Sequence, residues 1–180
     1  PTLDIGEFAV KSGVITSSVD RFEFKIKGKG AHAAKPEQGK DPMIVLGQLI
    51  NSVQSIVSRN LSAFDNAVVT IGEVSCGNTW NVIADEAYVQ GTVRSFDEDK
   101  RVLIEERLRA IGSGLAEVFG VDIETSYHRL PGAVVNDEQL TNDAIAIAKE
   151  VGYTKYRNAN AIADKDLKTD PIFVENGKVI

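Results

Sequence analysis

The residue with the clearest chemical potential is His32, which lies on a glycine-rich loop, G-K-G-A-H-A-A-K-P-E-Q-G-K-D-P, at residues 28–42. It is one of two histidines in the chain. On such a loop glycine permits close backbone approach, proline stiffens the chain, and an imidazole donates a hydrogen bond, carries a proton or binds a metal. A loop histidine also commonly bonds a backbone carbonyl, so the residues alone leave structural and functional roles equally open.

Two further polar residues lie next to predicted strands. Asn81 precedes the apolar pair Val82 and Ile83, and Arg94 ends a strand pattern. An asparagine in such a place is more often a turn former, and an arginine there is more often a solvated charge. However, a guanidinium binds a carboxylate with two hydrogen bonds, and a side-chain amide can hold a substrate amide. With His32, these residues would suit a small substrate that has an acid end.

Metal and nucleotide sites have little support in the residue types. His32 and His128 are the only histidines, Cys76 is the only cysteine, and there is no helical His-x-x-x-His pair. The chain also lacks a Gly-x-Ser-x-Gly nucleophile motif and a phosphate-binding P-loop. We therefore expect that residues of this chain bind no metal and no cofactor.

The elements that must position these residues follow from the periodicity of the apolar side chains. Alternation predicts strands, as in Phe22, Phe24 and Ile26, and steps of three and four predict amphipathic helices. The order is strand 22–26, helix 41–59, strand 67–74, strand 87–94, helix 97–119 and strand 121–127. This succession predicts a ferredoxin-like α+β sandwich, with an antiparallel four-stranded sheet and two helices on one face.

The flanking residues are less regular. Two short apolar pieces, 8–10 and 14–15, predict a small hairpin or an incoming segment, and 136–151 predicts a further helix. Residues 153–180 mix single apolar residues with charged ones. They are interpreted as a linker, a disordered end or part of another domain.

The composition is that of an ordinary soluble globular protein, 43% hydrophobic and 26% charged. The formal net charge of -6, with acids and bases interspersed, argues against nucleic acid or an anionic membrane as a partner. No apolar run approaches the roughly 20 residues that span a bilayer, and the N-terminus has no basic leader. A single cysteine, which cannot form an internal disulfide, favours a reducing, cytoplasmic location.

Five motifs in order resemble a known family. They are F-E-F-K-I-K-G-K-G-A-H-A-A-K-P-E-Q-G-K-D-P at 22–42, S-R-N at 58–60, N-V-I at 81–83, G-T-V-R-S-F at 91–96 and P-G-A-V-V-N-D at 131–137. Together they look like the dimerisation, or lid, domain of the metal-dependent amidohydrolases, the metallopeptidase family of aminoacylase, carboxypeptidase G and hippurate hydrolase. The branch that they resemble most is that of the bacterial N-acyl amino acid amidohydrolases.

The resemblance implies a role for each predicted residue. In that family a ferredoxin-like lid is inserted into a larger catalytic domain that holds two divalent metals, usually zinc or manganese. His32 matches the residue that stabilises the substrate carbonyl oxygen as it becomes an oxyanion, commonly in the active site of the partner subunit. Asn81 and Arg94 match the family's binders of the substrate amide and carboxylate. Lids that pair through an edge strand and a helix imply a homodimer.

Some residues depart from the family pattern. Ala84 replaces a proline, which is expected to loosen that turn, and Glu37 stands where many members have histidine. The family's metal ligands belong to the catalytic halves, outside this chain, and the last residues match nothing expected of the returning half. The implied organisation is an incoming segment 1–20, a lid domain 21–130, a return helix 131–152 and an unassigned tail 153–180.

We therefore expect the lid and dimerisation domain of an amidohydrolase that cleaves N-acyl amino acids, with its own catalytic domain and a second copy as partners. In the parent enzyme a metal-activated water would attack the amide, so this chain alone should be inactive. The main alternative is a non-catalytic ligand-binding or dimerisation module of ferredoxin-like fold. An RNA-binding domain of that topology would need paired aromatics on the central strands, where Tyr88 is nearly alone.

Overall fold

The structure, a computed structural model, describes residues 7–151, 155–157, 174–175 and 178–179. The chain divides into two compact units. The larger unit is Ser17–Ala133, and the smaller unit combines Pro1–Thr16 with Val134–Ile180. The lid boundaries expected from the sequence, 21 and 130, fall inside the larger unit, and each unit is described by itself.

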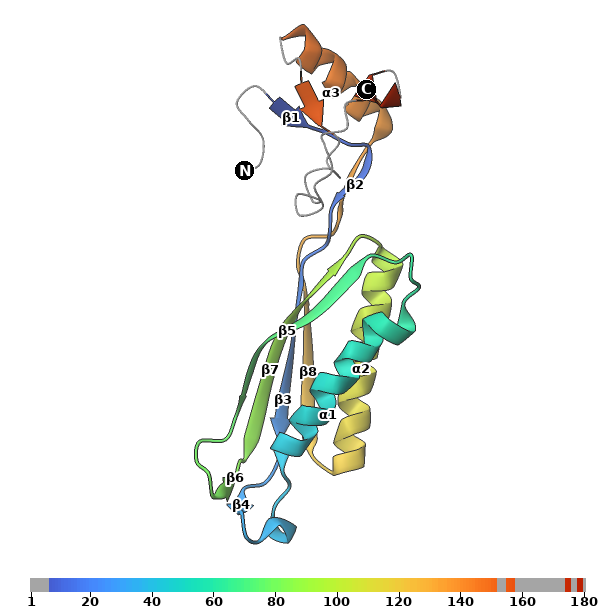
Figure 1. The fold of residues 1–180 in the computed structure, drawn as a ribbon. Coiled ribbons are helices and arrows are strands. Elements are labelled where there is room, and N and C mark those ends of the chain that lie inside the picture. Colours follow the sequence, from blue (N-terminus) through green and yellow to red (C-terminus); the bar gives the residue numbers. More distant parts are fainter. Residues whose placement is uncertain (1–6, 152–154, 158–173, 176–177, 180) are drawn as a thin grey trace. The chain divides into compact units, whose positions relative to one another are not determined.

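The larger unit has the predicted ferredoxin-like architecture (Figure 1). Its four strands pair antiparallel in the order β5-β7-β3-β8, and both long helices lie on one face of the sheet. The elements are β3 (Asp20–Lys27), α1 (Pro42–Ser55), β5 (Ala67–Cys76), β7 (Glu86–Ser95), α2 (Glu98–Phe119) and β8 (Asp122–Arg129). The predicted succession of strands and helices is therefore confirmed.

The core lies between the sheet and the two helices. Buried and more exposed residues alternate along β3, so Phe22, Phe24 and Ile26 all face the helices. Gly91 on β7 is a requirement of this packing, because a Cβ there would overlap the ring of Phe22 and the carbonyl oxygen of Thr70. Fully buried aliphatic side chains complete the core: Val45, Leu49, Val53, Ile56, Val89, Val93, Ile104 and Leu108.

The helices of the larger unit begin and end at residues suited to those places. The Asp41 carboxylate caps α1 by accepting a hydrogen bond of 2.8 Å from a backbone N–H of the first turn. Asp97 caps α2 in the same way, and Gly120 ends α2 in the left-handed conformation, with φ of 61°. Helical backbone continues beyond α1 as a π-helical turn, η2 (Ile56–Asn60), so the helix ends close to the predicted position.

The smaller unit pairs segments from the two ends of the chain. Of the two alternatives predicted for the N-terminal segment, the hairpin is wrong, because β1 and β2 each pair with a strand from the later part of the chain. The predicted helix is present as α3, capped by Asp137. The rest of 153–180 lies outside the described residues. The elements are β1 (Glu7–Ala9) parallel to β10 (Lys155–Arg157), β2 (Gly13–Thr16) antiparallel to β9 (Val134–Asn136), α3 (Glu138–Glu150), and β11 (Val174–Glu175) antiparallel to β12 (Lys178–Val179).

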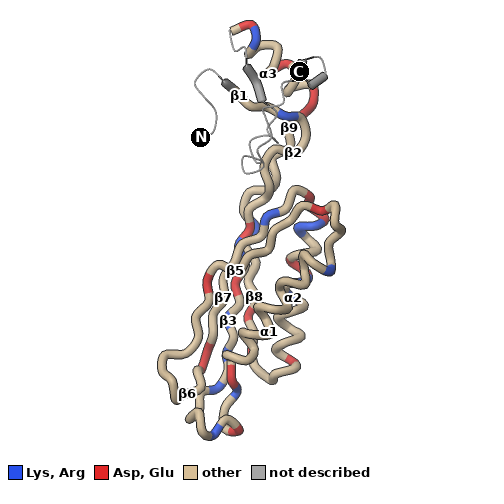
Figure 2. Tube along the Cα trace, in the orientation of Figure 1, with Lys and Arg blue, Asp and Glu red and all other residues tan. Residues whose placement is uncertain are grey.

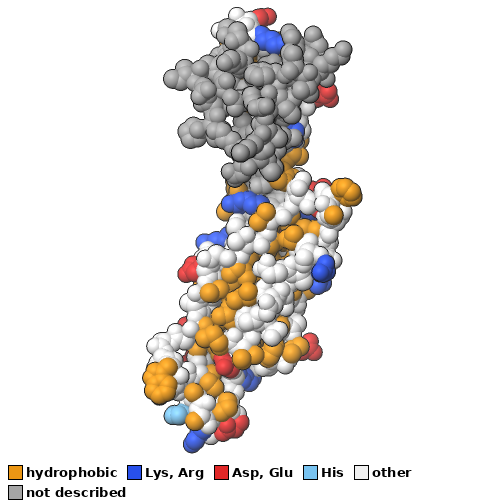
Figure 3. Space-filling view, viewed as in Figure 1, with side chains coloured by type: hydrophobic (Ala, Val, Ile, Leu, Met, Phe, Trp, Pro, Cys, Tyr) orange, Lys and Arg blue, Asp and Glu red, His pale blue; other side chains and the backbone are white. Residues whose placement is uncertain are grey.

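The surface of the larger unit carries interspersed charges and an exposed apolar region. Basic and acidic residues are interspersed along its strands and helices (Figure 2). Apolar side chains gather over α1 and the edge strand β5 (Figure 3), where Met43, Ile44 and Val74 are each about half exposed. Among the helices described here, none is long and apolar enough to cross a membrane.

A buried ion pair joins the start of β3 to α2 at one end of the sheet. Asp20, the first residue of β3, accepts hydrogen bonds from Arg101 Nε at 2.7 Å, from the Tyr127 hydroxyl at 2.8 Å and from the Leu130 N–H at 3.0 Å. Arg101 on α2 also donates to the Leu130 carbonyl at 2.7 Å. Burial raises the pKa of Asp20, but these hydrogen bonds and the charge of Arg101 outweigh burial and hold it below its usual value.

We expect Asp20→Asn to lower the free energy of unfolding by roughly 3–5 kcal/mol, because it removes the buried counter-ion of the Arg101 guanidinium and leaves only the exposed carboxylate of Glu98. Since the folded state lowers the pKa of Asp20, the stabilisation is present above the unfolded value, about 4, and is lost as pH falls through the folded value. Urea denaturation between pH 7 and pH 2 measures both effects, with exposed Glu124→Gln as control. Equal stability and equal pH dependence in Asp20→Asn and wild type would contradict this role.

Candidate functional site

The glycine-rich loop and the segment before β7 form a small ribbon at one end of the sheet. β4 (Ala31–His32) pairs antiparallel with β6 (Val82–Ile83), so His32 lies opposite Val82. The ribbon lies beyond the end of β3 and β7 (Figure 1), and a short 3-10 helix, η1 (Pro36–Gln38), follows it along the chain. Two segments that are distant in sequence therefore share one tip.

Asp85 holds the base of this ribbon. Its backbone oxygen accepts a hydrogen bond from the Gly28 N–H at 2.8 Å, and its carboxylate accepts one from the Gly30 N–H, also at 2.8 Å. At Gly30 a Cβ would lie 2.7 Å from the Asp85 Oδ1 atom, so a larger residue would displace this carboxylate. Ala84 stands where the family pattern has proline, but the two hydrogen bonds that the neighbouring Asp85 accepts hold this turn in place.

Asp85 was not among the residues that the sequence singled out. Its hydrogen bond to Gly30 joins positions 55 residues apart, and no local periodicity reports such a contact. The available signal was the close spacing of Gly28 and Gly30, since glycine pairs often accompany close approach of another part of the chain.

His32 is exposed, and its own loop orients the imidazole. The Nδ1 atom accepts a hydrogen bond of 3.0 Å from the backbone N–H of Ala34. An accepting Nδ1 carries no proton, which places the proton of the neutral ring on Nε2. Among the described residues Nε2 has no hydrogen-bond partner, so His32 presents an N–H donor at the tip.

Asn81 lies half-buried beside His32. Its backbone oxygen accepts a hydrogen bond of 3.0 Å from the Ala33 N–H, which extends the ribbon by one residue pair. Its side-chain Oδ1 makes only a long contact, 3.5 Å, with the Thr79 hydroxyl. The structure therefore brings together two of the three predicted site residues, His32 and Asn81.

Arg94 lies at the opposite end of the same sheet. Arg94 is eight residues along β7 from Glu86, the first residue of the strand. At a rise of about 3.3 Å per residue, the Cα atoms of these two residues lie ~26 Å apart. Its side chain is half-buried, and its one hydrogen bond is a long one of 3.5 Å to the Val93 carbonyl. Within the described part of the chain its guanidinium has no carboxylate partner, unlike those of Arg101, Arg109 and Arg129. Arg94 thus offers a cation, but far from His32.

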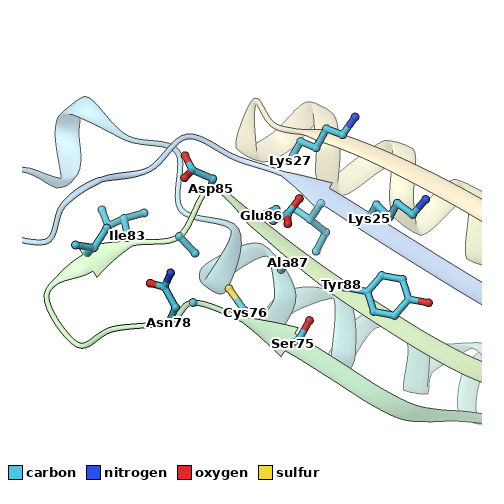
Figure 4. A pocket seen from close by; sticks show the side chains of 14 residues that line it. Lys25, Lys27, Ser75, Cys76, Asn78, Ile83, Asp85, Glu86, Ala87 and Tyr88 are labelled. Atoms are coloured by element: carbon cyan, nitrogen blue, oxygen red, sulfur yellow. The ribbon is translucent and has the colours of Figure 1, made fainter.

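A pocket of about 630 Å³ opens beside the ribbon (Figure 4). Its charges are balanced, because Lys25 and Lys27 on β3 accompany Asp85 and Glu86 at the start of β7. Neither His32, Asn81 nor Arg94 is among its lining residues. Nowhere in the described residues do three or more His, Cys, Asp or Glu side chains gather as metal ligands, so the residues present here do not fit a metal site.

Comparison with known proteins gives a consistent result. The family model described as a peptidase dimerisation domain, M20_dimer, matches residues 15–116. The chain is 42% identical over 153 residues to an N-acetylcysteine deacetylase of Bacillus subtilis (strain 168). This alignment covers 85% of this chain and 40% of that protein. It is 35% identical over 149 residues to an N-acetyldiaminopimelate deacetylase of Geobacillus sp. (strain WCH70), covering 83% and 40% respectively.

A solved structure supports the same grouping. The Bacillus subtilis YXEP protein, described as a dinuclear metal binding peptidase from the M20 family, superposes with a TM-score of 0.69 at 34% identity, covering 88% of this chain and 39% of that one. The chain spans about two fifths of the length of these relatives, 40% and 39% in the two cases. With the predicted fold confirmed and the family model matching more than half of its residues, the chain belongs to the M20 family as a peptidase dimerisation domain.

Proposed function

We propose that this chain is the lid and dimerisation domain of a metal-dependent amidohydrolase that hydrolyses the amide bond of N-acyl amino acids. Two relatives named as deacetylases of N-acetylated amino acids support this substrate class. The observation that carries the proposal is the orientation of His32, whose Nδ1 is occupied by the Ala34 N–H while Nε2 offers a donor at an exposed tip.

His32 has the properties that amide hydrolysis requires of an oxyanion-stabilising group. When water adds to an amide carbonyl, negative charge develops on the carbonyl oxygen. A donor that is already oriented stabilises this charge more in the transition state than in the ground state, and so raises kcat. The hydrogen bond to Ala34 fixes the tautomer that donates from Nε2. Asn81, on the same ribbon, is proposed to hold the substrate amide.

Arg94 is proposed to bind the substrate carboxylate, and its position implies that two copies of the chain share each site. A small N-acyl amino acid cannot span the ~26 Å between the ends of β7. One lid therefore cannot supply both His32 and Arg94 to one substrate. We infer that each active site takes Arg94 from one subunit and His32 with Asn81 from the other.

The edge strand β5 is the proposed contact between the two lids. It has only one neighbour in the sheet, and an unpaired edge of ten residues is a template for another strand. Val74 on β5 and Ile44 on α1 expose apolar surface there, each about half exposed. A second copy that pairs through β5 about a two-fold axis would cover both the edge and this surface.

The remaining parts of the proposal lie outside this chain. We place two divalent metals, zinc or manganese, in the catalytic domain of the full-length enzyme, because a relative is described as a dinuclear metal binding peptidase. The described residues do not assemble a metal site, so no step is assigned to a metal here. We expect the isolated chain to be inactive. We also expect the enzyme to be cytoplasmic, because a chain with a single cysteine suits a reducing compartment.

In the full-length enzyme, we expect His32→Ala to lower kcat on N-acetyl amino acids by about 100-fold to 1000-fold, because the oxyanion loses a donor. Metal content, measured by elemental analysis, should not change. The matched control is His128→Ala, since His128 is the other histidine and lies on β8 near Glu23, away from the tip. Wild-type turnover in His32→Ala, or an equal loss in His128→Ala, would refute the assignment.

A second prediction concerns how the tip is held. Gly30→Ala forces the Asp85 carboxylate away, so we expect kcat to fall by about 10-fold to 100-fold through displacement of His32, with little change in thermal stability. Gly114→Ala is the control, because its added Cβ meets no atom within 4 Å. Steady-state kinetics measures kcat, and thermal melts measure the stability, of both variants. If Gly30→Ala turns over like the control, Asp85 does not position His32.

A further inference from the structure

The only tryptophan of the chain, Trp80, lies in the turn directly before Asn81, and 92% of its surface is exposed. Tryptophan is highly buried on average, because its ring removes a large apolar area from water when it packs. Trp80 is not exposed alone, because Val82 and Met43, each about half exposed, lie with it around one hollow, and a contiguous apolar patch of this kind marks a contact surface.

The position of Trp80 is tied to that of His32. The Asn81 oxygen accepts the Ala33 N–H at 3.0 Å, and the next residue pair along the ribbon is Val82 with His32. Trp80 thus stands one residue beyond the last hydrogen bond of the ribbon that carries His32. Trp80 and His32 therefore lie at the same tip of the larger unit.

Trp80 also borders a shallow hollow of about 600 Å³. Much of its lining is apolar, from Ala33, Met43, Val82 and Ile83, and Asp41 is its one carboxylate. A concave surface of this size accepts small organic groups. Charged substituents would gain little from it, whereas an aliphatic or aromatic group could lie between this surface and the indole ring.

We propose that Trp80 is a specificity-determining residue that packs against an apolar substituent of the N-acyl amino acid bound in the partner subunit's active site. This inference rests on the proposed function, in which His32 and Asn81 bring the ribbon to the amide that is cleaved. Apolar groups flank that amide on two sides, as the acyl chain and as the amino acid side chain. The indole ring offers the same chemistry to either.

The test compares kcat/KM for N-acetylglycine, N-acetylphenylalanine and N-benzoylglycine in the full-length enzyme and its Trp80→Ala and Trp80→Phe variants. We expect Trp80→Ala to lower the preference for one of the larger substrates over N-acetylglycine by about 10-fold to 100-fold. Trp80→Phe should keep most of that preference. The substrate that responds identifies the acyl side or the amino acid side. Val118→Ala should change no ratio, because Val118 is an exposed apolar residue, 76% exposed, on α2, which carries none of the proposed site residues.

The outcomes separate this inference from the proposed function. Unchanged ratios in Trp80→Ala, or an equal loss on all three substrates as a subunit contact would give, overturn the role of Trp80 even if His32→Ala abolishes turnover. Shifted ratios in Trp80→Ala together with full turnover in His32→Ala support Trp80 and overturn the role of His32. Failure of the full-length enzyme to hydrolyse any N-acyl amino acid overturns both.

Discussion

The fixed length of β7 is the constraint on which the site depends. A strand rises by a nearly constant distance per residue, and β7 is paired along its length with β5 on one side and β3 on the other. It cannot fold back to bring Arg94 to His32. His32, on the ribbon beyond the start of β7, and Arg94, which has no carboxylate partner among the described residues, are therefore held at opposite ends of the sheet. In the proposed symmetric pair of lids, each lid would offer one end to its own subunit and the other end to its partner.

The two ends of the sheet are built from different interactions, and these suit different tasks. At the Arg94 end the Asp20–Arg101 pair is buried and ties the first residue of β3 to α2 and to the segment after β8. At the other end the ribbon is exposed and held by backbone hydrogen bonds and by the Asp85 carboxylate. A rigid sheet anchored at one end can position a small exposed tip at the other, which is how loops commonly carry function on stable scaffolds.

The fold could be predicted because its information is local. Alternation on β3, helical spacing on α1 and α2, and caps such as Asp41 and Gly120 each act within a few residues. The failed N-terminal hairpin shows the limit of such signals. Gly13 and Asn136 pair across most of the chain, and two short apolar runs contain nothing that identifies so distant a partner. Three features of the site likewise depend on tertiary structure. They are the placement of His32 beside Asn81, the hydrogen bond from Gly30 to Asp85, and the distance between His32 and Arg94.

Subunit mixing tests directly whether His32 and Arg94 reach each active site from different subunits, as we propose. His32→Ala and Arg94→Ala full-length enzymes, each inactive alone, would be unfolded together, refolded and assayed on an N-acetyl amino acid. A mixed dimer then contains one site with both native residues, so random mixing should restore about a quarter of wild-type activity. If dimers form and exchange but no activity returns, both residues act from the same subunit, and the account is wrong.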